Sequence, residues 1–205
     1  MKKLIKLAAA LTLAAATSAC TTDTISRAVP LSAPLGATLP TADAVLVAPD
    51  FRVTQVHVVV PDTLTVSEDN GIKPRADIVW REDPYGDRYA QVKAVMEAGL
   101  MQGAKTLSGQ KAVTLDVQLV RFHAQTERVR YSNLPSKHEI EFLLTVRDAN
   151  TGAVIVPAHM VNATLDALGG NAAIVADRAG ITQKSRIDAH LAQVIQAELG
   201  KPVTL

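Results

Sequence analysis

Hydrophobic residues with a period of two mark several segments of the chain as strands. The stretch from Phe51 to Val60 is rich in valine and bounded by Pro49 and Pro61, which predicts a buried first strand that residues 64–66 could extend. Over 113–122 apolar and polar residues alternate, and a change of phase at Val120 predicts a bulge in a long strand. Alternation over 140–146, a turn over 148–152 and an apolar stretch over 154–165 predict a hairpin.

A period of three to four residues predicts a helix after the first strand. Asp83 followed by Pro84 offers a start signal, so the helix should begin there or at Asp87. Its apolar face is formed by Tyr89, Val92, Met96, Leu100, Gly103 and Leu107. Gly99 and Gly103 lie four residues apart and would let another backbone approach this helix closely.

A closing helix follows Gly169 and Gly170 and ends at Gly200. It presents Ile187, Leu191, Val194, Ile195 and Leu199 on one face. The order strand, helix, three strands, helix is typical of an α+β fold, and we expect an antiparallel β-sheet with two helices packed on one face. Residues 43–205 are expected to form this single domain.

The first residues have the features of a secretory signal peptide. Lysines at positions 2, 3 and 6 precede an apolar run of about ten residues, which is too short to span a bilayer. The sequence Thr17-Ser18-Ala19-Cys20 then resembles a bacterial lipobox. It predicts a signal peptide over 1–19, cleavage between Ala19 and Cys20, and a lipid on the Cys20 thiol. Ordinary signal peptidase could also accept these small residues and would release a protein without a lipid.

Cysteine usage favours lipidation. Cys20 is the single cysteine in 205 residues, and it occupies the one position where lipid attachment requires a cysteine. Because no second cysteine is present, no internal disulfide can form, and the fold depends on its apolar core. Residues 20–42 are rich in Thr, Ala and Pro, and we expect them to tether the domain to the lipid.

Charge and composition exclude a nucleic-acid partner. Without the three lysines of the signal peptide, 18 basic side chains stand against 20 acidic ones, a net charge of about −2. Aromatic residues make up 3% of the chain, which removes the stacking surface that single-strand binders use.

Several stretches carry a resemblance to known families: VWREDPYGDRYAQVKAVMEAGL, DVQLVRFHAQ, LLTVRDANTG and GITQKSRIDAHL. The chain resembles a family of uncharacterised alphaproteobacterial lipoproteins and, in its fold, the auxiliary lipoproteins of ABC-type transport systems. The resemblance implies a periplasmic domain, usually anchored to the outer membrane, that works with other envelope proteins. Only Cys20 carries over as a functional residue, and Thr21 beside it fits sorting to the outer membrane.

No motif in the sequence predicts a catalytic or metal site. His138-Glu139 begins like a zinc-protease motif, but Phe142 occupies the place of the second histidine. The five histidines are His57, His123, His138, His159 and His190. They are scattered along the chain, so we expect each to be exposed or hydrogen-bonded and none to be a metal ligand. We therefore predict no catalytic residue, metal or cofactor.

Trp80 and a charged segment each allow two interpretations. Trp80, the only tryptophan, is expected to be a half-buried anchor beneath the first helix, with contact to a partner protein as the alternative. Arg121, Glu127, Arg128 and Arg130 mix charges along a predicted strand, which favours a solvated surface over a docking site.

These features favour a non-enzymatic, membrane-anchored component of the envelope, in the implied context of a lipid or ABC-type transport system. The alternative is a small-molecule or lipid-binding module, in which the sheet and helices enclose an apolar cavity. An enzyme has the least support, because no acid, base and nucleophile can be named together.

Overall fold

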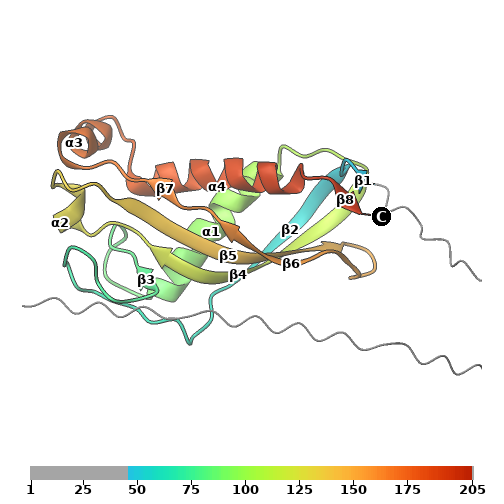
Figure 1. The fold of residues 1–205 in the computed structure, drawn as a ribbon, viewed down its shortest axis with the longest axis horizontal. Coiled ribbons are helices and arrows are strands. Elements are labelled where there is room, and N and C mark those ends of the chain that lie inside the picture. The colour runs from blue at the N-terminus through green and yellow to red at the C-terminus, as the bar shows by residue number, and fades with distance from the viewer. Residues whose placement is uncertain (1–45, 205) are drawn as a thin grey trace, which may run out of the picture. The chain divides into compact units, whose positions relative to one another are not determined.

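The computed structural model describes residues 46–204, which Figure 1 shows as a layer of strands beside two long helices. They belong to one compact unit, Asp43–Leu205. The signal peptide, the cleavage site between Ala19 and Cys20, the lipid site and the tether over 20–42 lie outside the described residues and stay predictions.

The described residues form eight strands and four helices. In chain order these are β1 (Leu46–Val47), β2 (Phe51–Val59), β3 (Ile78–Val79), α1 (Arg88–Ala104), β4 (Lys111–His123), α2 (Glu127–Arg130), β5 (Lys137–Asp148), β6 (Val154–Asn162), β7 (Leu165–Asp166), α3 (Gly170–Arg178), α4 (Gln183–Leu199) and β8 (Val203–Thr204). This order confirms an α+β fold.

The main sheet has the strand order β2-β4-β5-β6, with β3 paired to β4 and β7 paired to β5. β4 and β6 both run antiparallel to β5, and the predicted bulge in β4 lies between Leu119 and Arg121. The Asp148 carboxylate accepts hydrogen bonds from the backbone N–H groups of Asn150 and Thr151, at 2.8 and 3.0 Å. These bonds close the turn between β5 and β6 and confirm the predicted hairpin.

The first strand departs from the expected antiparallel arrangement. β2 runs parallel to β4, with Phe51 opposite Lys111 and Val59 opposite Gln118. The connection between them contains α1, and a crossover through a helix brings the next strand back in the same direction. The sheet is therefore mixed: β2 and β3 both run parallel to β4 and precede α1, whereas β4, β6 and β7 each pair antiparallel with β5.

Both long helices pack on the same face of the sheet, as predicted. Buried and half-buried residues alternate along β5, so one face of the sheet meets the helices and the other is partly exposed. A Cβ added to Gly103 of α1 would lie 2.2 Å from the carbonyl oxygen of Ala192 in α4. The predicted close approach at Gly99 and Gly103 is thus confirmed, and the partner is α4.

α1 begins after Asp87, one of the two predicted starts, and the Asp87 side chain accepts a hydrogen bond from the Ala90 N–H at 3.1 Å. The helices differ from the prediction at three places. α1 ends at Ala104, before Leu107 of the expected apolar face. Gly180, with a φ of 75°, separates α3 from α4, so the chain closes with two helices instead of one. The single turn of α2 lies between β4 and β5, and four residues are too few to show a helical period.

Candidate functional site

An apolar groove lies between the edge strand β6 and the end of α4, and we call it the β6–α4 groove. Its volume is about 280 Å³. The lining residues are Phe51, Leu144, Val146, Val156, Pro157, Ala158, His159, Glu198, Leu199, Lys201, Pro202 and Val203. Nine of these twelve are apolar, and the volume is close to the lower end of the range for small-molecule sites, roughly 300 Å³.

The floor of the groove is the hydrophobic core itself. Phe51, Leu144 and Leu199 are buried members of the core cluster, yet they also line the groove. An apolar ligand would therefore contact the core without burying a polar group of the protein at the floor, and each Å² of apolar surface it covers would contribute about 25 cal/mol.

Three polar side chains converge at the rim of the groove. Glu198 accepts a hydrogen bond from Lys201 Nζ at 2.6 Å, and its second oxygen lies 3.2 Å from His159 Nε2. The other ring nitrogen of His159 lies 3.1 Å from the carbonyl oxygen of Pro157. A few convergent polar groups beside an apolar floor are the usual means of orienting an amphiphilic ligand.

The two ends of the described chain meet at the groove. β1 pairs antiparallel with β8, with Leu46 opposite Thr204 and Val47 opposite Val203. Val203 lines the groove together with the two residues before it. The described part of the chain therefore begins beside the groove.

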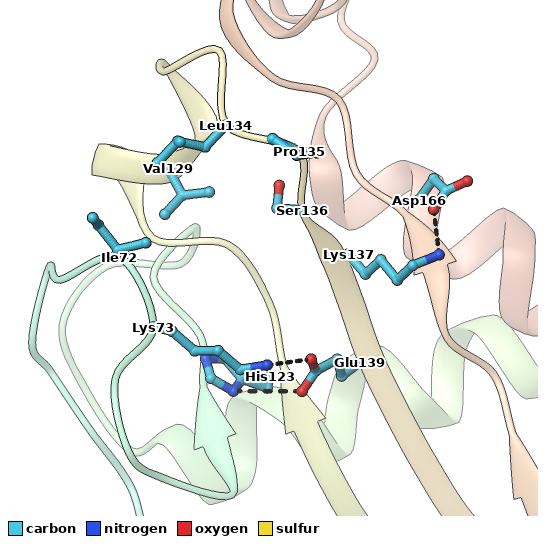
Figure 2. A pocket seen from close by; sticks show the side chains of 10 residues that line it. All are labelled: Ile72, Lys73, His123, Val129, Leu134, Pro135, Ser136, Lys137, Glu139 and Asp166. Carbon is cyan, nitrogen blue, oxygen red and sulfur yellow. Dashed lines mark hydrogen bonds and ion pairs between the residues drawn. The ribbon is translucent and has the colours of Figure 1, made fainter. Parts of the chain in front are cut away.

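A second pocket lies near the beginning of β5, and Figure 2 shows its residues. We call it the α2 pocket, and its volume is about 370 Å³. The lining residues are Ile72, Lys73, His123, Val129, Leu134, Pro135, Ser136, Lys137, Glu139 and Asp166. Apolar side chains gather on one side of this pocket and charged ones on the other (Figure 2).

Glu139 is the centre of charge in the α2 pocket. One of its oxygens accepts from Lys73 Nζ at 2.7 Å and the other accepts from Arg121 Nε at 2.8 Å. The bond from Lys73, followed by that from Arg121, outweighs burial and lowers the pKa of the Glu139 carboxyl. Lys137 pairs with Asp166 at 2.6 Å. Both lysines of the pocket are therefore neutralised by carboxylates.

His123 is not arranged as the base of a Ser-His-Asp triad. Its Nδ1 lies 2.6 Å from Arg121 Nη2, and because arginine only donates, Nδ1 accepts. Burial, and after it the charge of Arg121, lowers the pKa of His123. The neutral ring then carries its proton on Nε2, whereas a triad needs Nδ1–H directed at a carboxylate. Ser136 Oγ instead accepts a hydrogen bond from Gln125 Nε2 at 2.7 Å.

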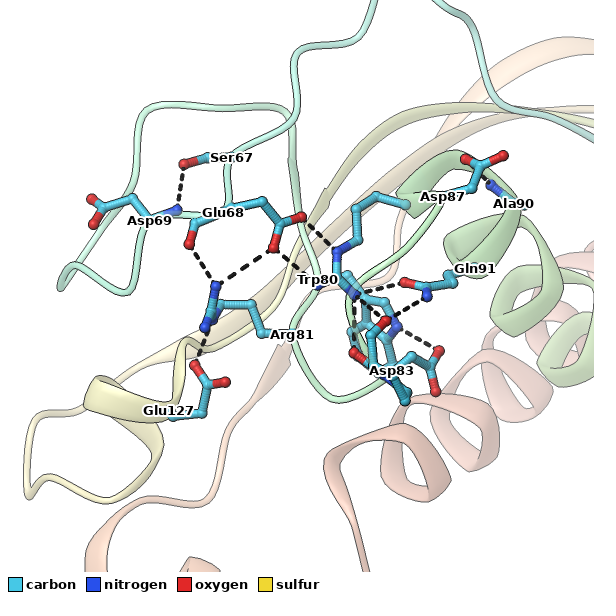
Figure 3. A network of polar contacts seen from close by, with 12 residues as sticks. Ser67, Glu68, Asp69, Trp80, Arg81, Asp83, Asp87, Ala90, Gln91 and Glu127 are labelled. Carbon is cyan, nitrogen blue, oxygen red and sulfur yellow. Dashed lines mark hydrogen bonds and ion pairs between the residues drawn. The ribbon is translucent and has the colours of Figure 1, made fainter.

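A polar network, shown in Figure 3, fixes the loop over 60–77 against α1. The buried Arg88 donates from Nε and Nη2 to the two carboxylate oxygens of Glu68, at 2.7 and 2.9 Å. Arg81 donates to the Glu68 carbonyl and to the Glu127 carboxylate, both at 2.5 Å. Because this loop carries Lys73, the network also positions the charged side of the α2 pocket.

Trp80 is an anchor inside the domain. It is fully buried, and its ring lies edge-on to Phe122 with 5.5 Å between the ring centroids. Its Nε1 donates to Asp83 at 2.7 Å, and Asp83 also accepts from Lys184 of α4 at 2.9 Å. The anchor interpretation is confirmed with deeper burial than expected, and the alternative of a partner contact is wrong.

The charged residues of the predicted strand surface lie on two elements and do not share one solvated face. Arg121 lies on β4, whereas Glu127, Arg128 and Arg130 lie in α2. Arg128 is exposed, but Arg130 is only 4% exposed and forms an ion pair with Asp177 of α3. The expected solvated surface is therefore wrong for Arg130, because the helical turn directs its side chain against α3.

The structure keeps the histidines in separate environments. His57 is exposed on β2, and His138 is fully buried on β5. Neither ring nitrogen of His138 has a hydrogen-bond partner among the described residues, so the expectation that each histidine is exposed or hydrogen-bonded is wrong there. Between residues 46 and 204 no group of three His, Cys, Asp or Glu side chains could hold a metal ion, and no helix of that range could cross a membrane.

A protein-family model matches residues 51–205, the DUF6778 family of unknown function. The chain belongs to this family. This match confirms the expected membership of an uncharacterised family. No curated protein matches the sequence of this DUF6778 protein.

Solved structures resemble the DUF6778 chain only distantly. A Xanthomonas campestris protein of the DUF330 family has a TM-score of 0.41 at 12% identity, over 78% of this chain and 87% of that one. A minor lipoprotein from Acinetobacter baumannii has a TM-score of 0.32 at 11% identity, over 71% of this chain and 91% of that one. Structural similarities this weak do not indicate a function.

Sequence reasoning does not single out the β6–α4 groove of the DUF6778 chain. Its apolar residues, such as Val156 and Leu199, have the same pattern as core residues. One local signal is Pro157 within a predicted strand, because proline occurs at sheet edges, and an edge is where a groove beside a helix can open.

Proposed function

We propose that this protein is a non-enzymatic lipoprotein of the bacterial envelope whose domain binds a lipid acyl chain in the β6–α4 groove. In this proposal Cys20 carries the membrane anchor, and the domain faces the periplasm at the outer membrane. The observation that carries the proposal is the groove itself, with a floor of core residues and polar groups at its rim.

The position of the groove favours a membrane lipid as its occupant. Residues 21–45 separate Cys20 from β1, which pairs with β8 beside the groove. Fully extended, these 25 residues span at most roughly 90 Å, so the anchor would keep the groove within that distance of a membrane surface. Acyl chains are the apolar ligands available there, and the polar side chains at the rim would face the headgroup.

We further infer an accessory role in a lipid or ABC-type transport system, with other envelope proteins as partners. The resemblance of the sequence to auxiliary transport lipoproteins supports this role, and a groove for acyl chains would be of direct use in it. The proposed role needs no catalytic residue, metal or cofactor.

Native mass spectrometry of the full-length protein, purified from membranes in mild detergent, tests the groove. We expect a lipid to copurify and to dissociate on denaturation, whereas a lipid on Cys20 would remain covalently attached. Val156→Trp places an indole in the groove and should reduce the dissociable lipid at least tenfold, because the added ring occupies the volume of the chain.

Met160→Trp is the matched control for the groove experiment. Met160 lies on the same strand, is 53% exposed and pairs with Leu143 outside the groove. This variant should keep the wild-type amount of lipid. Recovery of the wild-type protein without dissociable lipid, or with the same amount as Val156→Trp, would contradict the proposed function.

A further inference from the structure

Three nitrogen-bearing side chains form a buried polar cluster away from the β6–α4 groove. We call it the His138 cluster, and it consists of Arg130 at the end of α2, His138 on β5 and Arg186 near the beginning of α4. His138 is 0% exposed and Arg130 is 4% exposed, whereas Arg186 is half-buried. Four of their nitrogen atoms are buried without a hydrogen-bond partner among the described residues: Nη1 of each arginine and both ring nitrogens of His138.

Hydrogen bonds and strand register bring these groups to one place. His138 lies opposite Leu165 of β7, and Arg186 Nη2 donates to the carbonyl oxygen of the next residue, Asp166, at 2.9 Å. The positive charges of Arg186 and Arg130 add to burial in lowering the pKa of His138. Burial, followed by the charge of Arg130, lowers the pKa of Arg186. Each group therefore lies within electrostatic reach of the others.

Positive charge exceeds negative charge in the His138 cluster. Arg130 has a carboxylate partner in Asp177. Among residues 46–204, no carboxylate lies within ion-pair distance of Arg186, since Asp166 offers it a backbone oxygen and pairs its own carboxylate with Lys137. Arg186 is half-buried, and even partial burial without a counter-charge is unfavourable for a guanidinium, so one negative charge would balance this cluster.

We propose that the His138 cluster binds a small oxyanion, a phosphate or a carboxylate, between α2, β5 and the beginning of α4. The two free Nη1–H groups and one ring N–H would donate to its oxygens. Arginine pairs well with both anions, because its planar fork matches their geometry and the bonds are charge-assisted.

Charge and enclosure select this ligand over the alternatives. A buried water could accept some of these hydrogen bonds, but it would add no negative charge, and the half-buried Arg186 would have only solvent to offset its own charge. The complete burial of His138 restricts the ligand to a small ion and disfavours the headgroup of an intact lipid. The oxyanion site is independent of the acyl-chain groove, which lies at the opposite end of β5.

Thermal unfolding of the full-length protein tests the site with inorganic phosphate and acetate as probes. Each is titrated at constant pH and ionic strength, with chloride as the reference anion. At about 100 times its Kd, a bound anion should raise the Tm by roughly 5–10 °C. The assigned ring ¹⁵N signals of His138 should move with the same saturation curve. Glycerol 3-phosphate distinguishes a free anion from a lipid headgroup as the ligand. A site for free anions should exclude it, whereas a headgroup site should bind it.

Arg186→Gln should weaken anion binding at least tenfold, since it removes the unbalanced charge and retains much of the side chain's length. Arg128→Gln is the matched control, because Arg128 is exposed on α2 beside Arg130 and should not affect binding. Two results would overturn the proposal. One is a Tm that responds to phosphate and acetate no more than to chloride, which indicates a water; the other is a Tm response that persists in Arg186→Gln.

Discussion

Single side chains in this domain take their properties from the elements that enclose them, and His138 shows this most directly. Burial on β5, followed by the charges of Arg186 from α4 and Arg130 from α2, lowers its pKa to about 3. The unfolded chain would titrate near 6.5, so the folded state binds fewer protons between these values. The contribution of this residue to stability is therefore complete above about pH 6.5 and is lost as the pH falls from there toward 3.

At this scale we predict a pH effect that depends on His138. In phosphate-free buffer, the wild-type free energy of unfolding should fall below pH 6.5 by up to about 1.4 kcal/mol per pH unit on account of this ring. His138→Leu should have a shallower pH dependence, because no proton has to be excluded from the buried site. Urea unfolding at several pH values between 7 and 4 measures both slopes.

The exposed His57 provides the control for this titration. His57→Gln should keep the wild-type slope, because this side chain is exposed on β2 and lies outside the cluster. Equal slopes in the wild type and His138→Leu would show that the buried ring does not control acid stability.

At the scale of elements, the contact between α1 and α4 depends on the absence of two side chains. Leu191 Cβ would lie 2.8 Å from a Cβ at Gly99, and the Ala192 backbone would be closer still to one at Gly103. Both distances are shorter than packed carbon and oxygen atoms accept, so larger residues would push the helices apart and disturb the core between them and the sheet.

Gly103→Ala is expected to destabilise the protein by about 1–3 kcal/mol through overpacking. Helix propensity alone acts in the opposite direction and would stabilise the variant by about 1 kcal/mol. The sign of the change in the free energy of unfolding therefore shows which of the two effects is larger. Chemical denaturation gives the difference. Gln102→Ala, at the exposed neighbouring position, should change stability by no more than about 0.5 kcal/mol. A Gly103→Ala protein more stable than the wild type would refute close packing at this site.

The sequence predicts a strand or helix where a hydrophobic period persists, but it does not predict which element lies beside it. Alternation along β4 and β5 reports which face is buried, and the phase change at Val120 identifies the bulge. The same pattern contains no information on which strand lies alongside, so the parallel pairing of β2 with β4 could not be predicted. The β6–α4 groove could not be predicted for a related reason, because its lining comes from four separate stretches of the chain, at residue 51 and over 144–146, 156–159 and 198–203.

At the scale of the whole molecule, the proposed anchor would decide where the domain acts. We predict that labelled palmitate enters the wild-type protein in cells and that Cys20→Ala abolishes incorporation and releases the protein from the membrane fraction. The reason is that Cys20 is the only thiol in the chain. Gel fluorography after palmitate labelling, with fractionation of membranes, measures both effects.

A displaced cysteine separates lipidation at the cleavage site from unspecific acylation. In the double variant Cys20→Ala, Ser26→Cys, the single thiol lies six positions further along, so label should stay absent. Incorporation into this variant, or an unlabelled wild-type protein, would contradict anchoring at Cys20 and favour release by ordinary signal peptidase.

The ladder between β1 and β8 has a mechanical consequence. A force applied at Leu46 by the preceding chain acts first on two residue pairs, Leu46 with Thr204 and Val47 with Val203. Further pulling would load β2 along its axis, where a long parallel register with β4 resists sliding. The short ladder should therefore yield under tension before the sheet does. Because Val203 lines the β6–α4 groove, a pull on the tether would reach the wall of the groove while the core remains folded.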